Sequence, residues 1–246
     1  MSIAVNLSQK LSKKLSDSGT AVFDLAESSL RELNVTLQAL AGDTNTTAWN
    51  ILNPRGAHAV AVGITTPVSV TIDGHVGYYC AGMNDGANIV ITGNAGPGVA
   101  ENMMSGLVRV LGDASQAAGA TAHGGLLIIE GNASGRCGIS MKGIDIVVKG
   151  SVGHMSAFMA QSGNFVILGD AGEALGDSLY EARIFVRGEV ASLGADCVEQ
   201  PMSEEDRTIL QGLLQKSGAK ANPEEFRRYG SARKLYHFHV DNAGAY

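Results

Sequence analysis

Glycine recurs every 19 residues through the middle of this 246-residue chain, over six successive intervals without an insertion. The members of this series are Gly74, Gly93, Gly112, Gly131, Gly150, Gly169 and Gly188. A fixed period of this length is typical of solenoids, in which each repeat is one structural unit stacked on its neighbours. The period therefore constrains the architecture before any residue propensity is considered.

Other positions of the repeat hold one kind of residue throughout. Each unit ends in a run of three β-prone residues, from 89–91 in the first unit to 184–186 in the sixth, and the first and third residues of the run are always large and apolar. This alternation predicts a short strand with one inward face. Seven residues after the marker glycine stands a very small residue, which we also expect to face inward: Ala81, Ala100, Gly119, Gly138, Ala157 and Gly176.

Short strands in identical phase predict an all-β fold, a right-handed parallel β-helix with 19-residue coils. Successive strands would lie about 4.8 Å apart, so that their apolar columns form one continuous core. The right hand is expected because nearly all parallel crossover connections have it. We expect an N-terminal segment with a capping helix over 1–50, the β-helix over 51–200, and a C-terminal helical cap with an aromatic tail over 201–246.

Helix signals stand on both sides of the repeats. Asp24 and Glu27 have the spacing of a capping box, and four leucines follow at helical spacing before Gly42, which predicts a helix beginning near Asp24. Ser203 and Asp206 predict the start of a second helix in the same way. A solenoid has two open ends that would template aggregation unless they are covered, so both segments are expected to act as caps.

Composition excludes several classes of function. The formal net charge is −6 and basic runs are missing, which argues against a nucleic-acid partner. No apolar segment is long enough to span a bilayer, and the polar N-terminus lacks a signal-peptide core, so we expect a cytoplasmic protein without a membrane partner. Cys80 and Cys137 stand three periods apart in one column, too far for a disulfide, and with Cys197 they are expected to be free structural thiols.

No catalytic, cofactor-binding or metal-binding residues are predicted in this chain. The loop Gly93–Gly98 has the look of a dinucleotide loop, but Glu101 replaces the last glycine of that motif and the repeat itself explains the glycines. His237 and His239 would share one face of a strand without a third ligand. The polar residues that follow the marker glycines are expected to form a solvated turn edge: His75, Asn94, Asp113, Asn132, Ser151, Asp170 and Glu189.

Longer runs carry a family resemblance. They are NPRGAH from Asn53, GHVGYYCAGMNDGANIVITGNAG from Gly74, RCGISMKG from Arg136, GHMSAFMAQ from Gly153, GDSLYEARIFVRG from Gly176, SLGAD from Ser192 and LYHFHVDNAGAY from Leu235. Over about 50–240 the chain resembles the GXGXG β-helix at the C-terminus of the glutamate synthase large subunit. The closest resemblance is to the stand-alone β-helix subunit of N-methylglutamate synthase, while the related β-helix subunit of formylmethanofuran dehydrogenase is an alternative.

This resemblance implies a non-catalytic subunit of a hetero-oligomer. Its partners would be an amidotransferase-like subunit and a glutamate synthase-like subunit that binds FMN and an iron–sulfur cluster, and the β-helix would join them and shape nitrogen transfer. Two other hypotheses remain: an independent enzyme or sugar-binding β-helix, which would need a carboxylate cluster or an aromatic platform, and a purely structural self-assembling solenoid.

Under the joining hypothesis, two segments are candidates for partner or passage contacts. The candidate residues are Asn53, Arg55, His58, Arg227, Tyr236 and Phe238. The alternative for Arg55 and His58 is a cap contact within this chain, and the alternative for the aromatic tail is a cap packed on its own chain.

Overall fold

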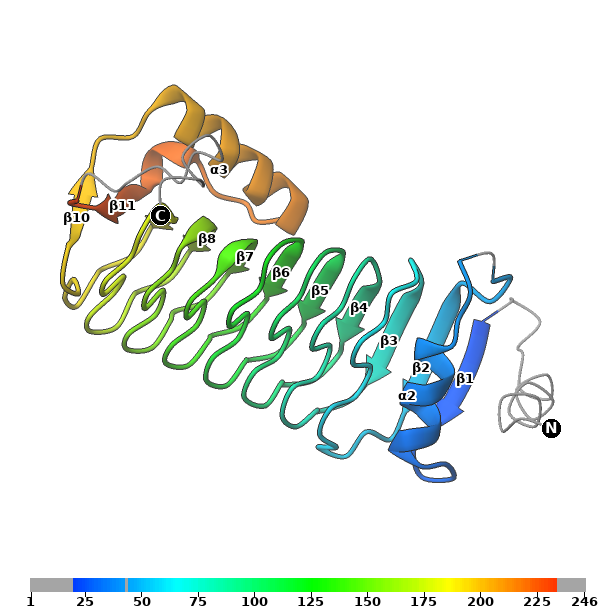
Figure 1. The fold of residues 1–246 in the computed structure, drawn as a ribbon. Coiled ribbons are helices and arrows are strands. Elements are labelled where there is room, and N and C mark those ends of the chain that lie inside the picture. Colours follow the sequence, from blue (N-terminus) through cyan, green and yellow to red (C-terminus); the bar gives the residue numbers. More distant parts are fainter. Residues whose placement is uncertain (1–19, 43, 234–246) are drawn as a thin grey trace, which may run out of the picture.

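The computed structural model describes residues 20–42 and 44–233, which form a long solenoid with a helix near each end (Figure 1). The elements in chain order are β1 (Thr20–Asp24), α2 (Leu30–Gln38), β2 (Ala48–Leu52), β3 (Ser69–Asp73), β4 (Asn88–Ile91), β5 (Leu107–Val110), β6 (Leu126–Ile129), β7 (Lys142–Val148), β8 (Ser162–Ile167), β9 (Arg183–Val186), β10 (Cys197–Gln200), α3 (Glu204–Ser217), a 3₁₀ helix η1 (Pro223–Glu225) and β11 (Arg227–Ser231).

One sheet runs the length of the molecule, in the order β1-β2-β3-β4-β5-β6-β7-β8-β9-β11-β10. Strands β1 to β9 pair in parallel, and from β3 to β9 paired residues stand 19 positions apart, as in Ile89↔Val108↔Leu127, except at Lys142↔Ser162, where the register shifts by one residue. A second line of parallel bridges follows the small residues after the marker glycines, from Val76↔Ala95 to Ala171↔Val190. The predicted parallel β-helix with 19-residue coils is confirmed.

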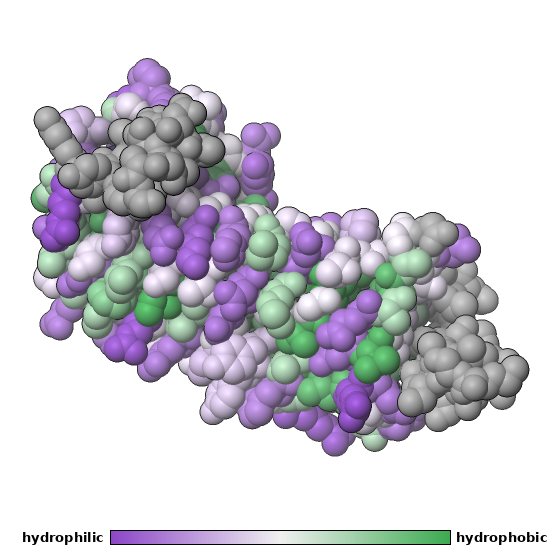
Figure 2. Space-filling model, in the orientation of Figure 1, coloured by the Kyte–Doolittle hydropathy of each residue, from purple (hydrophilic) through white to green (hydrophobic). Residues whose placement is uncertain are grey.

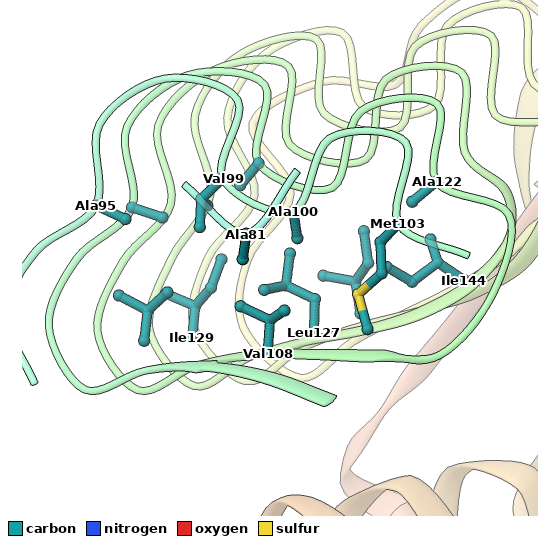
Figure 3. Close-up of a cluster of buried hydrophobic side chains, with 14 of the residues drawn as sticks. Ala81, Ala95, Val99, Ala100, Met103, Val108, Ala122, Leu127, Ile129 and Ile144 are labelled. Atoms are coloured by element: carbon teal, nitrogen blue, oxygen red, sulfur yellow. The ribbon is translucent and has the colours of Figure 1, made fainter. Parts of the chain in front are cut away.

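The interior is filled by side chains from every coil (Figure 3). The first and third residues of each strand run are fully buried, for example Val108 and Val110 of β5. Opposite them lies the column of smallest residues, in which Ala81, Ala100 and Ala157 are also fully buried. The inward faces predicted from the sequence are therefore confirmed.

Crowding is not the only physical reason why the residues in this column are small. All six members have a left-handed backbone, with φ between 57° at Ala81 and 70° at Gly138. Glu101 N donates to Gly98 O, so that Ala100 takes the third position of a turn with the features of type II, where φ must be positive. A left-handed backbone costs a non-glycine residue roughly 1–2 kcal/mol, and the cost grows with side-chain bulk.

The polar residues after the marker glycines form a hydrogen-bonded ladder and not only a solvated edge. Each side chain accepts from the backbone N–H of the same position in the next coil: Asp113 N donates to Asn94 Oδ1 at 3.0 Å, and Asn132 N donates to Asp113 Oδ1 at 2.7 Å. The same pattern continues through Ser151 to Glu189. Since every such N–H is paired, the turns of successive coils are held in register.

This ladder explains the marker glycines. A Cβ added at Gly131 would overlap Asp113 Oδ1 and would lie 2.9 Å from Gly112 O, so only glycine lets the coils approach this closely. Most marker glycines have no positive φ, which means that close approach and not backbone freedom requires them.

We expect Gly131→Ala to lower the free energy of unfolding by about 2–4 kcal/mol, because the Cβ must push apart two coils of a close-packed structure. Gly212→Ala is the matched control: it lies in α3 with open space around its Cα, so it should stabilise the chain by about 0.5–1 kcal/mol. Urea unfolding of both variants measures the difference. Equal stabilities would contradict the assignment of the marker column.

The N-terminal end is covered by α2, as expected, but the helix begins later than predicted. Asp24 ends strand β1, and its Oδ1 accepts from Ala26 N, while Ser29 and Glu32 form the capping box of α2. The prediction was wrong because the Asp24–Glu27 spacing imitates a capping box inside a turn. Leu33 of α2 is fully buried in the core, and Figure 2 shows apolar side chains gathered near this end.

The C-terminal end is closed by strands as well as by the predicted helix. β11 pairs antiparallel with β9, and β10 pairs antiparallel with β11 at the edge of the sheet. Helix α3, capped by Ser203 and Asp206 as predicted, lies along the outer face of β7 to β9. Its leucines cover an outward apolar column that the repeat pattern alone did not single out: Val147, Val166 and Phe185 with Leu210, Leu213 and Leu214.

Arg109, the one charge in the middle column of the repeat strands, holds the far end of α3. Its Nη2 donates to Ser217 O at 3.2 Å, and its Nη1 pairs with Glu130, which also pairs with Lys149. A cation at a helix C-terminus stabilises the unpaired carbonyls and the helix dipole. Within the part of the chain that the structure describes, no helix is long and apolar enough to cross a membrane.

Candidate partner-binding surface

The Asn53–His58 segment connects β2 to the first complete turn of the solenoid, and its residues Asn53, Arg55 and His58 are exposed while Pro54 is buried. Asn53 and Arg55 have left-handed backbones, with φ of 55° and 45°. Asn53 Nδ2 donates to Asp24 Oδ1 at 2.8 Å, which ties the loop to the end of β1. Arg55 makes no hydrogen bond or ion pair with any described residue, so its guanidinium faces solvent. Asn53 thus has a cap contact within this chain, whereas Arg55 does not.

His58 stacks on Tyr78, which occupies the equivalent position of the next coil. The ring centroids lie 4.2 Å apart with an interplanar angle of 2°, and His58 Nδ1 accepts from Tyr78 N at 3.1 Å. This hydrogen bond places the ring hydrogen of neutral His58 on Nε2. A Cβ at Gly77 would overlap the imidazole, so the glycine makes room for the stack.

Tyr79 extends the aromatic pair toward the following coil. Its ring meets that of Tyr78 edge-on, with centroids 6.4 Å apart, and lies over Gly98 beside the Glu101 carboxylate. Burial raises the pKa of that carboxylate. Met83 follows Tyr79 by four residues in the same coil. Tyr78, Tyr79 and Met83 are 50%, 52% and 55% exposed, and together with His58 they form what we name the N-terminal aromatic surface.

Two members of this surface have backbones that suit glycine better. Tyr79 has φ of 58° and Met83 has φ of 54°. At the position of Tyr79 the other coils use mostly small residues, among them Gly98, Ala117 and Ala174. A large side chain at either position has the energetic cost of a left-handed backbone and, because it is exposed, adds nothing to the packing of the core. The left-handed backbone itself recurs at these positions in the other coils, for example at Ala117 and Asn102, so it is the large exposed side chains that set this surface apart.

Comparison with known proteins identifies a relative that spans most of this chain. The chain is 64% identical over 226 residues to "Protein GlxC" of Rhizobium meliloti (strain 1021), a match that covers 92% of this chain and 99% of the relative. This chain belongs to the GlxC family. No protein-family profile matches the chain, and no solved structure does. The relative's name states neither an activity nor a partner.

Another predicted contact residue of this GlxC family member, Arg227, lies away from the aromatic surface. Arg227 is on β11 at the opposite end of the solenoid, where its Nη2 donates to Gly188 O at 2.7 Å and Glu189 lies within ion-pair distance. Arg227 therefore holds the last coil, and the structure does not bring it near Arg55. Tyr236 and Phe238 lie outside the described residues, so their assignment stays a prediction.

Sequence reasoning missed Tyr78, Tyr79 and Met83 as candidates. A signal was present, because Tyr79 and Met83 stand in columns that are otherwise filled by small or polar residues except for Met155 and Met159. Two adjacent tyrosines in a chain with only 5% aromatic residues also stand out. What could not be read from the sequence is that both columns point outward.

The three cysteines are free and buried, as predicted. Burial raises the pKa of the Cys80 thiol beyond its ordinary range, that of Cys137 to about 12 and that of Cys197 to about 11. Thiols with such pKa values stay protonated at neutral pH and are poor nucleophiles and metal ligands. Across the described residues, no three His, Cys, Asp or Glu side chains come together as a metal site.

We expect Arg55→Ala to weaken assembly with a partner, or nitrogen transfer within the complex, while the isolated chain keeps its stability. The guanidinium contacts no described residue, so its loss removes nothing from the fold. Thermal unfolding of the isolated chain and coupled turnover of the assembled complex measure the two effects. Lys216→Ala, on an exposed part of α3, is the control. Normal assembly and normal coupled turnover with Arg55→Ala would rule out the assignment.

Proposed function

We propose that this chain is the non-catalytic β-helix subunit of a glutamate synthase-like complex, and specifically of an N-methylglutamate synthase. In that reaction methylamine and L-glutamate give N-methyl-L-glutamate and ammonia. The chain joins an amidotransferase-like subunit to a subunit that holds FMN and an iron–sulfur cluster. It also contributes part of the route that nitrogen takes between them.

The observation that carries this proposal is the N-terminal aromatic surface. It includes His58 of the Asn53–His58 segment, which is a candidate for partner contacts under the joining hypothesis, and it exposes three large side chains on the repeat. Aromatic and methionine side chains are enriched at the centres of protein interfaces. The match to "Protein GlxC" adds no activity or partner, so the general part of the proposal, an accessory subunit related to glutamate synthase, rests on the resemblance of the repeats to the GXGXG β-helix.

The packing of the solenoid suggests where nitrogen would travel. Fully buried side chains from each coil, such as Val99, Met103 and Leu127, meet in the interior (Figure 3). Protein interiors packed in this way leave few voids larger than a water molecule. A route for ammonia or methylamine would therefore run along an outer face, between this chain and a partner. The chain would act as a wall of that passage.

Affinity purification from the native host tests the proposal. The tagged chain is recovered, its partners are identified by mass spectrometry, and the visible spectrum is recorded. We expect an amidotransferase-like subunit and a flavin-containing subunit, with flavin absorbance. A colourless chain recovered alone would contradict the proposal. Molybdenum- or tungsten-enzyme partners would instead support the formylmethanofuran dehydrogenase alternative.

A further inference from the structure

A second group of apolar side chains is exposed in the same columns of the solenoid, three and four coils beyond the coil of Tyr78, Tyr79 and Met83. It consists of Ile139, Met155, Phe158 and Met159, which we name the mid-coil surface. Met159 is 40% exposed and the other three are half-buried. Ser140 N donates to Phe158 O at 2.8 Å and Arg136 N donates to His154 O at 2.9 Å, so the two contributing coils lie side by side.

Two methionines of this surface have left-handed backbones, as the same positions have in the other coils. Met155 and Met159 have φ of 53° and 52°. At the position of Met159 the neighbouring coils use Thr121, Ser140 and Ser178, which are small and polar. Methionine in a left-handed backbone contributes nothing to the core when it points outward. Its unbranched, polarizable side chain is, however, well suited to an adaptable contact surface.

Basic side chains border the mid-coil surface on two sides. Arg136 and His154 each come before the apolar residues of their own coil. Lys142 comes after Ile139, and His123 occupies the position of Lys142 in the preceding coil. All four side chains are exposed. Neither Arg136 nor Lys142 is in an ion pair with a described residue. Glu173 and Asp177 stand in the next coil, and the Asp177 oxygens accept hydrogen bonds from Ser178 Oγ and from Ala195 N. Arg136 and Lys142 are thus two exposed cations without an ion-pair partner among the described residues, in a chain of net charge −6.

We propose that the mid-coil surface binds a partner protein whose contacting face has apolar side chains at its centre and Asp or Glu side chains at its border. The argument is charge complementarity, since unpaired Arg136 and Lys142 would meet carboxylates while the methionines and Phe158 exclude water. Tyr79 and Met155 stand in the same column four coils apart, about 19 Å at the strand spacing. This inference rests on the proposed function and gives the joining subunit a second docking surface on the same side.

Two other occupants fit the charges less well. A second copy of this chain meeting the same surface across a two-fold axis would place Arg136 and Lys142 against like charges. An anionic membrane would be held by only two permanent positive charges, each contributing about 1 kcal/mol, against the net negative charge of the whole chain. Both are outcomes that the experiment separates.

Zero-length carbodiimide cross-linking of the native complex tests the proposal, because this reagent joins an amine to a carboxylate in direct contact. We expect Lys142 to be linked to an Asp or Glu of a partner subunit, and the exposed Lys220 of the same chain to serve as the unlinked control. Links from Lys142 only to a second copy of this chain, seen in a mixture of isotope-labelled and unlabelled protein, would overturn the proposal. Retention of the chain by vesicles of anionic phospholipid, without a cross-link from Lys142 to a partner, would also overturn the proposal.

Matched variants supply a second readout. Met159→Gly removes the side chain and suits the left-handed backbone, so the chain should fold normally while its affinity for the cross-linked partner falls at least ~10-fold. Ser178→Gly, in the same column with φ of 56°, should leave affinity unchanged. Arg136→Glu should weaken binding further and remove its salt dependence. Unchanged affinity in both Met159→Gly and Arg136→Glu would overturn the proposal.

The outcomes distinguish this inference from the proposed function. If the complex contains flavin but Lys142 is not linked to a partner, the joining function stands and the proposal for the mid-coil surface fails. If Lys142 is linked to a partner that carries no flavin and is unrelated to amidotransferases, the proposal for the mid-coil surface stands and the glutamate synthase-like function fails. A chain recovered without any partner contradicts both.

Discussion

Replacing Ala100 with leucine is expected to destabilise the chain by at least ~3 kcal/mol, a large part of the roughly 5–15 kcal/mol that stabilises an ordinary domain. Two physical costs add at this position. The column of smallest residues is fully buried and faces Val108 and Leu127 across a filled interior, so three extra carbons have no space. The backbone is also left-handed, with φ of 58°, which a branched side chain tolerates poorly.

Ala100→Gly separates these two costs. Glycine suits the left-handed backbone, as Gly119 and Gly138 show in the next two coils, and this gain offsets the small cavity left by the lost methyl. We therefore expect the glycine variant to stay within about 1 kcal/mol of the parent chain in urea unfolding. A folded and equally stable Ala100→Leu variant would show that the column does not face the interior.

Replacing Tyr79 with glycine is expected to have opposite effects on folding and on assembly. The isolated chain should keep or raise its Tm, because glycine removes the cost of a left-handed backbone, which is roughly 1–2 kcal/mol for other residues. The complex should lose at least ~10-fold in affinity, because an exposed tyrosine at the centre of an interface is a typical binding hot spot. Thermal unfolding and titration of the purified partner with the variant measure the two effects.

Ala117→Gly is the control for this experiment, since Ala117 stands in the same column with the same φ of 58° and offers no large side chain. It should raise stability without changing affinity. If Tyr79→Gly lowered the Tm by several degrees and left affinity unchanged, the tyrosine would be a structural residue and the N-terminal aromatic surface would lose its main member.

The period predicted the fold because a solenoid converts sequence spacing directly into spatial position. Once Ile89, Val108 and Leu127 are known to stand 19 residues apart, their pairing follows. The start of α2 was mispredicted because Asp24 and Glu27 imitate a capping signal that Ser29 and Glu32 in fact provide. Local spacing could not reveal that β1 extends the sheet, since that depends on pairing with β2.

The candidate surface was predictable only in part. His58 was singled out as a residue, but its stack on Tyr78 depends on a spacing of 20 residues at this point of the first coil, where the later coils have 19, so that position 58 lies next to position 78 and not 77. The outward direction of Tyr79 and Met83 follows from left-handed backbones that no composition rule assigns to a tyrosine or a methionine. The packing of α3 on the outer face of β7 to β9 was likewise not predicted, although Val147, Val166 and Phe185 form an apolar column in the sequence.

Reconstitution of activity from purified subunits tests the joining function most directly. The amidotransferase-like and flavin-containing partners are assayed with methylamine and L-glutamate, with and without this chain, and N-methylglutamate is measured by mass spectrometry. We expect methylamine-dependent product formation that falls at least ~10-fold when the chain is omitted and returns when it is added back, because nitrogen transfer depends on how the partners are positioned. Full activity without the chain, or a complete complex that forms no N-methylglutamate, would contradict this account.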